Sequence, residues 1–536
     1  SNTHFGLNAL SSVTTADEST AFGNNALGSQ QTGRNTAVGF HTLQDLTTGQ
    51  YNTAVGGEAA ENIIDGSFNV SVGSFSLRQN TSGSENTAIG YQSLSNNTTQ
   101  SKLTALGYRA GYFWTAGNEN TFIGHQAGFG TSAASTGGEN TLVGSLAGAS
   151  SAGITGSGNT SIGRFTLNAL SSGSFNTALG HQSGISITTG NANTLVGKNS
   201  GVNIGSASRN SVLGQSAGQA LTTASDNVAI GYEALFNQVS NGQNIAIGVN
   251  ALYSYTGTRT IAIGYNAGKN FASNVDCVFI GQETGYGRTE GIDNTFVGAY
   301  ANYAGGTGCC NTGVGKSSGY SLTSGVQNTF LGRQAGYSVT SDNNNTLIGH
   351  NTGLFVTGGQ NTFIGSGAGD AITTGSHNNI FGYNCEASSV SGTDQIVIGT
   401  NGQLGKGNST GFISPGTGGV FQGNNNTTWS NTSDERIKKN IVDNNKGLEI
   451  INKIQIRNFE YRTEDEITDF ENPKSAVVNK EGIQLGVIAQ EIEKILPETI
   501  TEESTGVKTL NSDNLTWYLI NAVKELKAEI ELLKNK

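Results

Sequence analysis

The stretch NTAVGFHTLQDLTTGQYNTAVG, residues 35–56, contains the segment NTAVG twice, with its two final glycines 17 residues apart. With that glycine as the anchor, variants of the segment give 24 copies between Gly6 and Gly399. Of the 23 spacings, 18 are 17 residues, three are 16, and the two around Gly144 are 20 and 19. A fixed period of this length is typical of solenoids. The sequence therefore predicts that residues 1–400 are an all-β body, a parallel β-roll or β-helix solenoid of about 24 coils.

Three positions of the repeat support this prediction. The residue before the anchor glycine is Val, Ile, Leu or Phe in every copy, and we expect it to form a buried stack. The residue four before the glycine is Asn in 19 copies, where an amide tolerates a left-handed turn and can bond to the same Asn one coil above. The third residue after the glycine is small in every copy through Gly382, as a packed corner requires. Proline, which would interrupt a ladder, first occurs at Pro415.

The residue two before the glycine is also apolar in most copies, for example Ala88, Phe122 and Leu195. Adjacent residues of a strand face opposite sides, so both sides of this strand are expected to be covered. One side closes the core of the coil and the other meets a partner chain, which predicts an oligomer. A monomeric solenoid with a thicker interior is the alternative. The repeat resembles the head of trimeric autotransporter adhesins, a left-handed parallel β-roll whose coils are shorter.

The composition changes at residue 433. Asp, Glu, Lys and Arg number 35 in residues 433–536, against 32 in the preceding 432 residues. We therefore expect a Gly/Asn-rich connector over 401–432 and a small α+β domain over 433–536. A terminal helix is expected over 513–535, capped by Asp513. Its apolar residues follow the 4, 3, 4, 3 spacing of a short coiled coil: Leu519, Val523, Leu526, Ile530 and Leu533.

Three sequence blocks of this domain, SDERIKKNI (433–441), FEYR (459–462) and GVIAQEIEKILPE (486–498), stand in that order before the final helix. Together they resemble the C-terminal intramolecular chaperone of phage tail fibres, tailspikes and endosialidases, a domain shared with the myelin regulatory factor family. The resemblance implies a domain that assembles three chains, seeds their β-structure and then cuts itself off with a Ser-Lys dyad.

Carried onto this chain, the resemblance implies that Ser433 is the nucleophile, Lys438 the base and Thr432–Ser433 the scissile bond. A lysine accepts a proton only when uncharged, which burial or a neighbouring cation favours. Arg436 and Lys439 are near enough in sequence to contribute. The other interpretation of this segment is a serine that caps a helix, followed by a solvated run of charges.

These features predict a trimeric viral tail fibre or receptor-binding adhesin that mediates attachment to the host surface. We expect a virion protein assembled in the host cytoplasm. Its expected partners are two further copies, a host cell-surface glycan or protein receptor, and other tail proteins. The tail proteins would be bound through an N-terminal part that precedes residue 1, because that residue already lies inside a repeat. A purely structural virion fibre and a bacterial trimeric surface adhesin are the alternatives.

Several other functions are not expected. The net charge of −11, with no basic stripe, argues against nucleic acid as a partner. No apolar run is long enough to predict membrane insertion. The six histidines lie on separated coils, so we expect no metal site, and no cofactor is expected either. The cysteines fall at different repeat positions, which predicts four free thiols: Cys277, Cys309, Cys310 and Cys385.

Paired carboxylates would be needed for a polysaccharide-degrading body. Glu119 and Glu139 occupy the same site on consecutive coils, and so do Asp276 and Asp293. Because Lys102 takes that site one coil before Glu119, a solvated charge ladder explains them better, and no enzyme activity is expected in the repeat body.

Aromatic residues cluster in two places. The stretch YRAGYFW, Tyr108 to Trp114, and the pair Tyr253 and Tyr255 could stack on sugar rings, or they could pack between coils.

Overall fold

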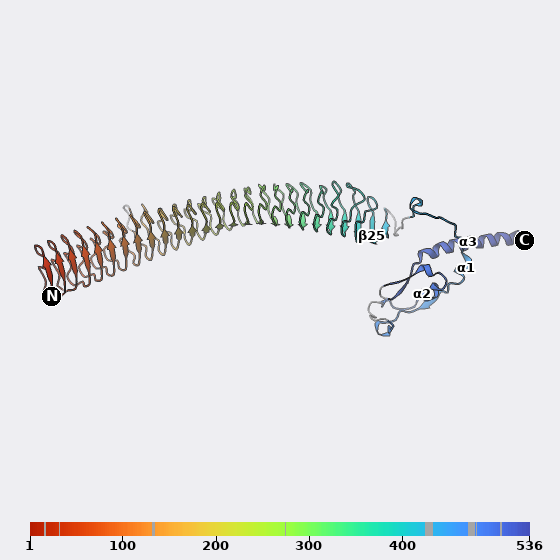
Figure 1. Ribbon diagram of the computed structural model, residues 1–536, viewed down its shortest axis with the longest axis horizontal. Coiled ribbons are helices and arrows are strands. Elements are labelled where there is room, and N and C mark those ends of the chain that lie inside the picture. The colour runs from red at the N-terminus through yellow and green to blue at the C-terminus, as the bar shows by residue number, and fades with distance from the viewer. Residues whose placement is uncertain are drawn as a thin grey trace. The chain divides into compact units, whose positions relative to one another are not determined.

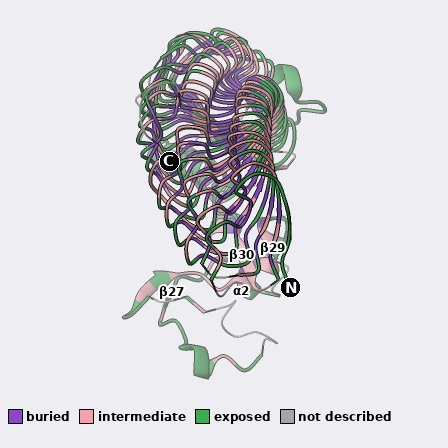
Figure 2. Ribbon diagram, turned by 90° about the vertical axis from the view of Figure 1, so that its left-hand side faces the viewer, coloured by how far each residue is buried: buried purple, intermediate pink, exposed green. Residues whose placement is uncertain are grey.

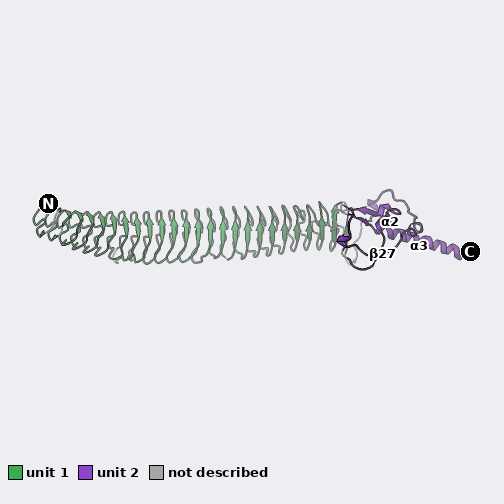
Figure 3. Cartoon of the chain, turned by 90° about the horizontal axis from the view of Figure 1, so that it is seen from below, with its two compact units in different colours: residues 1–431 green, residues 432–536 purple. Residues whose placement is uncertain are grey.

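The computed structural model describes most of the chain: residues 1–14, 18–31, 33–130, 135–273, 275–416, 418–423, 433–469, 477–478, 480–503 and 506–536. The chain divides into two compact units, Ser1–Asn431 and Thr432–Lys536 (Figure 3). Each unit is described by itself.

The first unit is a parallel β-solenoid, as the 17-residue period predicts (Figure 1). Each coil contributes one short strand that pairs in parallel with the strands of the neighbouring coils, so that Leu195, for example, pairs with Val212. The strands are β1 (Thr3–Phe5), β2 (Thr20–Phe22), β3 (Thr36–Val38), β4 (Thr53–Val55), β5 (Val70–Val72), β6 (Thr87–Ile89), β7 (Thr104–Leu106), β8 (Thr121–Ile123), β9 (Thr141–Val143), β10 (Thr160–Ile162), β11 (Thr177–Leu179), β12 (Thr194–Val196), β13 (Ser211–Leu213), β14 (Val228–Ile230), β15 (Ile245–Ile247), β16 (Ile261–Ile263), β17 (Val278–Ile280), β18 (Thr295–Val297), β19 (Thr312–Val314), β20 (Thr329–Leu331), β21 (Thr346–Ile348), β22 (Thr362–Ile364), β23 (Asn379–Phe381) and β24 (Ile396–Gly399).

Two further strands continue this ladder beyond the last repeat. Strand β25 (Gly411–Gly416) pairs in parallel with β24, and β26 (Gly418–Gln422) pairs antiparallel with β25. Both lie within residues 401–432, for which the sequence predicts only a connector. The change of direction at β26 ends the parallel stacking.

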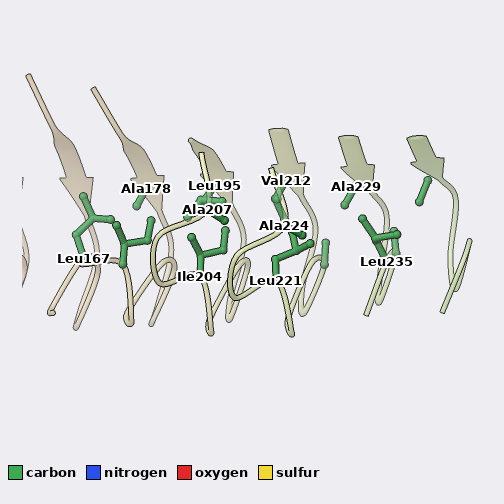
Figure 4. Close-up of a cluster of buried hydrophobic side chains, with 14 of the residues drawn as sticks. Leu167, Ala178, Leu195, Ile204, Ala207, Val212, Leu221, Ala224, Ala229 and Leu235 are labelled. Atoms are coloured by element: carbon green, nitrogen blue, oxygen red, sulfur yellow. The ribbon is translucent and has the colours of Figure 1, made fainter. Parts of the chain in front are cut away.

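The core of the solenoid is one continuous cluster of buried side chains that runs from Ala9 to Phe412. Figure 2 views the unit from its N-terminal end, and buried residues recur at the same places on every coil. The middle residue of each strand from β2 onward, two before the anchor glycine, points into this core, and Figure 4 shows Leu195 and Val212 there. We call this residue the inward position.

Side-chain sizes compensate inside each coil. Where the inward position is Phe, as at Phe122, the residue four after the anchor glycine is often Gly, and a Cβ on Gly128 would lie 2.4 Å from the Phe122 ring. Where the inward position is small, as at Ala229, the same site often carries a leucine such as Leu235. Interiors are close-packed, so the two positions share a fixed volume. The small residues three after the glycine are buried corners, as predicted.

The prediction for the residue just before the anchor glycine was wrong. This residue is not a buried stack: it is half-buried or exposed in every coil, for example at Leu213 and Leu331, while its neighbour at the inward position is buried. Adjacent strand residues face opposite sides of the sheet. The side that faces the core carries the residues whose size varies from coil to coil, two before the anchor glycine. The aliphatic residue therefore lies on the outer face of the sheet, and we call it the outward position.

The asparagines that stand four residues before the anchor glycine in 19 of the coils form the predicted ladder. The Nδ2 of Asn193 donates to Asn176 Oδ1 at 3.0 Å and to the Ala207 carbonyl oxygen at 2.9 Å. Its Oδ1 accepts from the backbone N and from Nδ2 of Asn210, both at 3.1 Å. The left-handed turn, however, falls one residue earlier, as at Ala192 with φ of 55°. The amide is buried and fully bonded, so the exposed neighbour takes the strained conformation.

The second unit is a small α+β fold. Its core is formed by Ile450, Ile492 and Leu496, against which Val487, Leu510 and Leu515 pack. Its elements are η1 (Glu435–Ile437), α1 (Leu448–Ile451), β27 (Arg457–Phe459), η2 (Glu464–Glu466), β28 (Gln484–Gly486), α2 (Ala489–Glu493), η4 (Pro497–Thr499), β29 (Ile500–Glu502), β30 (Lys508–Leu510) and α3 (Asp513–Lys534). Strands β27 and β28 form one antiparallel pair, and β29 and β30 form another.

Candidate functional site

Ser433 and Lys438 flank a single turn of 3-10 helix, η1. Asp434 caps this turn by accepting a hydrogen bond from the backbone N of Arg436 at 2.8 Å. At the other end the backbone N of Lys438 donates to the carbonyl oxygen of Glu435 at 3.0 Å. The turn thereby returns the chain on itself, and Lys438 Nζ donates to Ser433 Oγ at 2.7 Å. A serine hydroxyl in contact with a lysine amine is the geometry that a Ser-Lys nucleophile and base require.

The charged residues next to this pair, Asp434 and Arg436, bind each other. The Arg436 guanidinium lies 2.5 Å from Asp434 Oδ2. This hydrogen bond, together with the one from the Arg436 backbone, lowers the pKa of Asp434. From the sequence, Arg436 was a candidate for the cation that lowers the pKa of Lys438. In the structure it pairs with Asp434 instead. The Thr432 side of the expected scissile bond lies outside the described residues.

Three apolar residues in the same segment of the chain are exposed. Ser433 and Lys438 are both exposed. Ile437, Ile441 and Val442 are 68%, 64% and 84% exposed.

The terminal helix α3 is packed on one side. Ala522 is its buried residue, Glu525 accepts from the backbone N of Leu448 at 2.7 Å, and Asn521 donates to the Asn444 carbonyl oxygen at 2.6 Å. The predicted coiled-coil residues lie elsewhere on the helix and are 45–69% exposed: Leu519, Val523, Leu526, Ile530 and Leu533. The prediction that Asp513 caps this helix was wrong: Asp513 is the first residue of α3. Instead its backbone N donates to Asn511 Oδ1, and Ser512 stands at the N-cap position.

In each pair of carboxylates considered for hydrolysis, one is engaged by a basic neighbour. Glu119 Oε1 lies 2.9 Å from Lys102 Nζ, and Asp276 Oδ1 lies 2.7 Å from Arg259 Nε. The bond to Arg259 lowers the pKa of Asp276. The charge-ladder interpretation is confirmed at both places. Within the described residues, no group of three or more His, Cys, Asp and Glu side chains could hold a metal ion.

The aromatic candidates separate into buried and exposed residues. Trp114 and Tyr255 are fully buried and cannot meet a ligand. Tyr108 is 40% exposed but stacks on Tyr91 and on His125, with ring centroids 5.7 and 5.2 Å apart. These rings cover each other's faces, and a sugar ring stacks on an open face. Packing between coils is therefore the main use of this cluster.

A longer aromatic ladder was missed in the sequence. Tyrosines five after consecutive anchor glycines stack with ring centroids 4.7–5.3 Å apart: Tyr286, Tyr303, Tyr320 and Tyr337. The signal was present, because four copies in a row carry Tyr at one repeat position.

Two charged side chains, one buried and one half-buried, were also missed. Arg288 is fully buried in a column of otherwise mostly apolar residues, and burial lowers its pKa to about 10. Glu386 stands where other coils often carry Leu or Gly; burial and then a hydrogen bond shared with Asp370 raise its pKa to about 8. A charged residue in an apolar column is the sequence signal that could have revealed both. The four cysteines are free, as predicted.

One comparison with known proteins bears on this region. Residues 433–501 match the family model described as chaperone of endosialidase. The match begins at Ser433 itself and ends in β29, ahead of α3. No curated protein and no solved structure matches the chain. With this chaperone domain after a solenoid of 24 coils, the chain fits the architecture of a tail fibre or tailspike with a C-terminal chaperone domain. None of the described helices is long and apolar enough to cross a membrane.

Proposed function

We propose that the chain is one subunit of a homotrimeric virion tail fibre or spike whose C-terminal unit drives trimerisation and folding. The observation that carries this proposal is the apolar seam of α3, which is exposed in the single chain although the helix packs on its other side. Apolar residues at coiled-coil spacing are stable in water only when a partner helix covers them. The match of residues 433–501 to the chaperone of endosialidase model supports the same assignment.

The Ser433–Lys438 contact supports self-cleavage as the last step of assembly. In this proposal uncharged Lys438 takes the proton of the Ser433 hydroxyl while Oγ attacks the carbonyl carbon of Thr432. The proton passes to the departing amide nitrogen of Ser433, which breaks the peptide bond and leaves an ester. Water then hydrolyses the ester, releasing a carboxylate on residue 432 and restoring the hydroxyl of Ser433.

Burial is the condition this chemistry still needs, since a lysine amine loses its charge more readily out of water. The exposed Ile437, Ile441 and Val442 beside the dyad supply apolar surface that a partner chain would cover. We therefore place cleavage after trimer formation.

Attachment to the host surface is assigned to the solenoid body, with a glycan or a protein as the receptor. Exposed aromatic residues directly after the anchor glycines support this part of the proposal: Tyr232, Tyr265 and Tyr383 are 45–53% exposed. Such side chains are the usual contacts for sugars and for protein partners.

The test compares three forms of the chain: unaltered, Ser433→Ala, and truncated before residue 433. We expect the unaltered and Ser433→Ala chains to be trimeric and the truncated chain to aggregate or remain monomeric. Trimers of the Ser433→Ala chain are then tested for binding to host cells. Correct trimers from the truncated chain would refute the chaperone role, and trimers that bind no host surface would identify a purely structural fibre.

A further inference from the structure

The outer face of the solenoid sheet carries two uninterrupted columns of side chains. The outward position is Val, Ile, Leu or Phe in all 24 coils, and the residue two before it is Thr in most of them. Neither column contains a charged residue in any coil. Charges gather elsewhere on the coil, as in the Lys102–Glu119 and Arg209–Asp226 pairs five before the anchor glycine. The outer face of the sheet is therefore uncharged along its full length.

In the middle of the solenoid the second column is apolar as well as the first. On strands β14 to β17 the Thr column also changes to aliphatic residues, which gives a continuous patch of eight outward-facing side chains, and we call it the β14–β17 patch: Val228, Ile230, Ile245, Ile247, Ile261, Ile263, Val278 and Ile280. Every one of them is only partly buried in the single chain.

We propose that the outward positions of β1 to β24 form the seam along which a second and a third copy of this chain pack, parallel and in register, with the β14–β17 patch at its centre. This inference rests on the proposed homotrimer and states which face makes it.

The spacing of the coils indicates that the partner on this face is another copy of the chain. Neighbouring rungs of a β-ladder are about 4.8 Å apart, so the outward residues form a row with that repeat. A flat partner with another spacing would fall out of step within a few coils, whereas a second copy placed in parallel matches every rung. The uniform size of the outward residue fits this arrangement, because the inward position varies from Gly to Phe while the outward one stays aliphatic or Phe.

The available area also fits. Twenty-four rungs at about 4.8 Å give a length of about 110 Å, and two outward residues give a width of about 7 Å. The face therefore offers about 800 Å² per chain, shared between the two neighbours in a trimer, so that three chains together would bury about 2,400 Å², more than the roughly 1,600 Å² of a typical specific interface.

The test places a photo-crosslinking amino acid at position 247 in the full-length Ser433→Ala chain and, as a control, at position 239. Val239 is aliphatic and 46% exposed but lies outside both columns. We expect position 247 to give covalent dimers, with the linked peptide lying on β14 to β17 of the second chain, and position 239 to give none. The second measurement uses the double variant Ile247→Lys/Ile263→Lys against Val239→Lys. We expect the association constant of the double variant to fall by more than about a hundredfold, since each lysine would be desolvated in the seam.

The outcomes separate this inference from the proposed function. A trimeric mass with no link between chains from position 247, or with an unchanged association constant in the double variant, overturns the seam and leaves the trimer standing. A monomeric mass for the parent chain overturns both. Links from position 247 to a different column of the second chain also overturn the in-register arrangement.

Discussion

Lys438 Nζ lies 2.7 Å from Ser433 Oγ, across the single turn η1. The contact is local: five residues separate the two side chains, and Asp434 holds the turn between them by capping it and pairing with Arg436. The contact between the two side chains is thus present in the single chain, and the proposed cleavage requires a change only in its surroundings.

The first prediction concerns this dyad. Lys438→Arg keeps the positive charge but offers no base, because a guanidinium is not deprotonated in proteins. We expect both Ser433→Ala and Lys438→Arg to abolish cleavage between residues 432 and 433, as measured by the intact mass of the purified chain. Lys439→Arg, which alters the neighbouring lysine that makes no contact with Ser433 in the structure, is the control and should cleave normally. Cleavage of the Lys438→Arg chain at the parent's rate would exclude Lys438 as the base.

The second prediction concerns the asparagine ladder. Asn193→Ala removes an amide that bonds to both neighbouring coils, leaving the Ala207 carbonyl and the Asn210 backbone N–H unpaired and buried. We expect a loss of about 2–4 kcal/mol in local stability, measured as faster hydrogen exchange of the Asn210 amide. Asn191→Ala, two residues earlier on the exposed surface, should change it by less than about 1 kcal/mol. Equal effects of the two substitutions would mean that the ladder does not stabilise the coils.

The third prediction concerns the anchor glycines. Gly197 has a φ of +132°, and a Cβ there would lie 2.6 Å from the carbonyl oxygen of Gly214 on the next coil. Gly197→Ala should therefore cost about 3 kcal/mol or more, from backbone strain and the clash together. At Gly205 a Cβ would meet only the Thr222 carbonyl oxygen at 3.5 Å, so Gly205→Ala should change the free energy of unfolding by less than about 1 kcal/mol. A denaturant titration of both variants decides the matter, and comparable losses would contradict the close stacking of the coils.

The fourth prediction concerns pH. The pKa of Glu386 is raised to about 8 from its ordinary value of 4.5, by burial and then by the hydrogen bond with Asp370. The folded state therefore holds a proton that the unfolded state has lost. Its stabilising effect is complete below about pH 4.5 and disappears as the pH rises through about 8. The facing groups are Asp370, the backbone N of Ala371 and the Cys385 thiol.

Hydrogen exchange in the coil of β23 measures this effect. We expect protection to fall between pH 5 and pH 8 in the parent, after correction for the intrinsic exchange rate, and to stay constant in Glu386→Gln, which cannot ionise. Glu139→Gln, on an exposed site of an earlier coil, should leave the parent's dependence intact. The same pH dependence in the Glu386→Gln chain would show that another group is responsible.

The repeat itself was readable from the sequence because every coil obeys the same constraints. The anchor glycine is required by its positive φ, the buried asparagine by its bonds to both neighbouring coils, and the small corner residue by close packing. Each recurs at its own position of the repeat. The side on which the strand residues face was not readable from polarity, since both Ala178 and Leu179 are apolar. The distinguishing signal was size: Ala229 stands with Leu235 and Phe122 with Gly128, whereas the outward residue has no such partner within the coil.

In the C-terminal unit the sequence predicted residues better than contacts. Ser433 and Lys438, which the resemblance pairs, are in contact in the structure, and their catalytic roles stay predictions. The bounds of α3 differ by one residue from those expected. The pairing of Arg436 with Asp434, two residues away, was not foreseen, because a neighbouring carboxylate competes for any arginine within reach. Likewise, Asn511 bonds to the backbone N of Asp513, which the sequence had assigned as the cap itself.

The mass of the full-length Ser433→Ala chain in solution, measured by sedimentation equilibrium, shows whether the chain is a trimer. Three chains that share the seam of α3 and the outward face of the solenoid should sediment with three times the 55.4 kDa of one chain, at all concentrations above the dissociation constant. A particle with the mass of one chain would refute the trimer, since the exposed aliphatic rows would then have no partner.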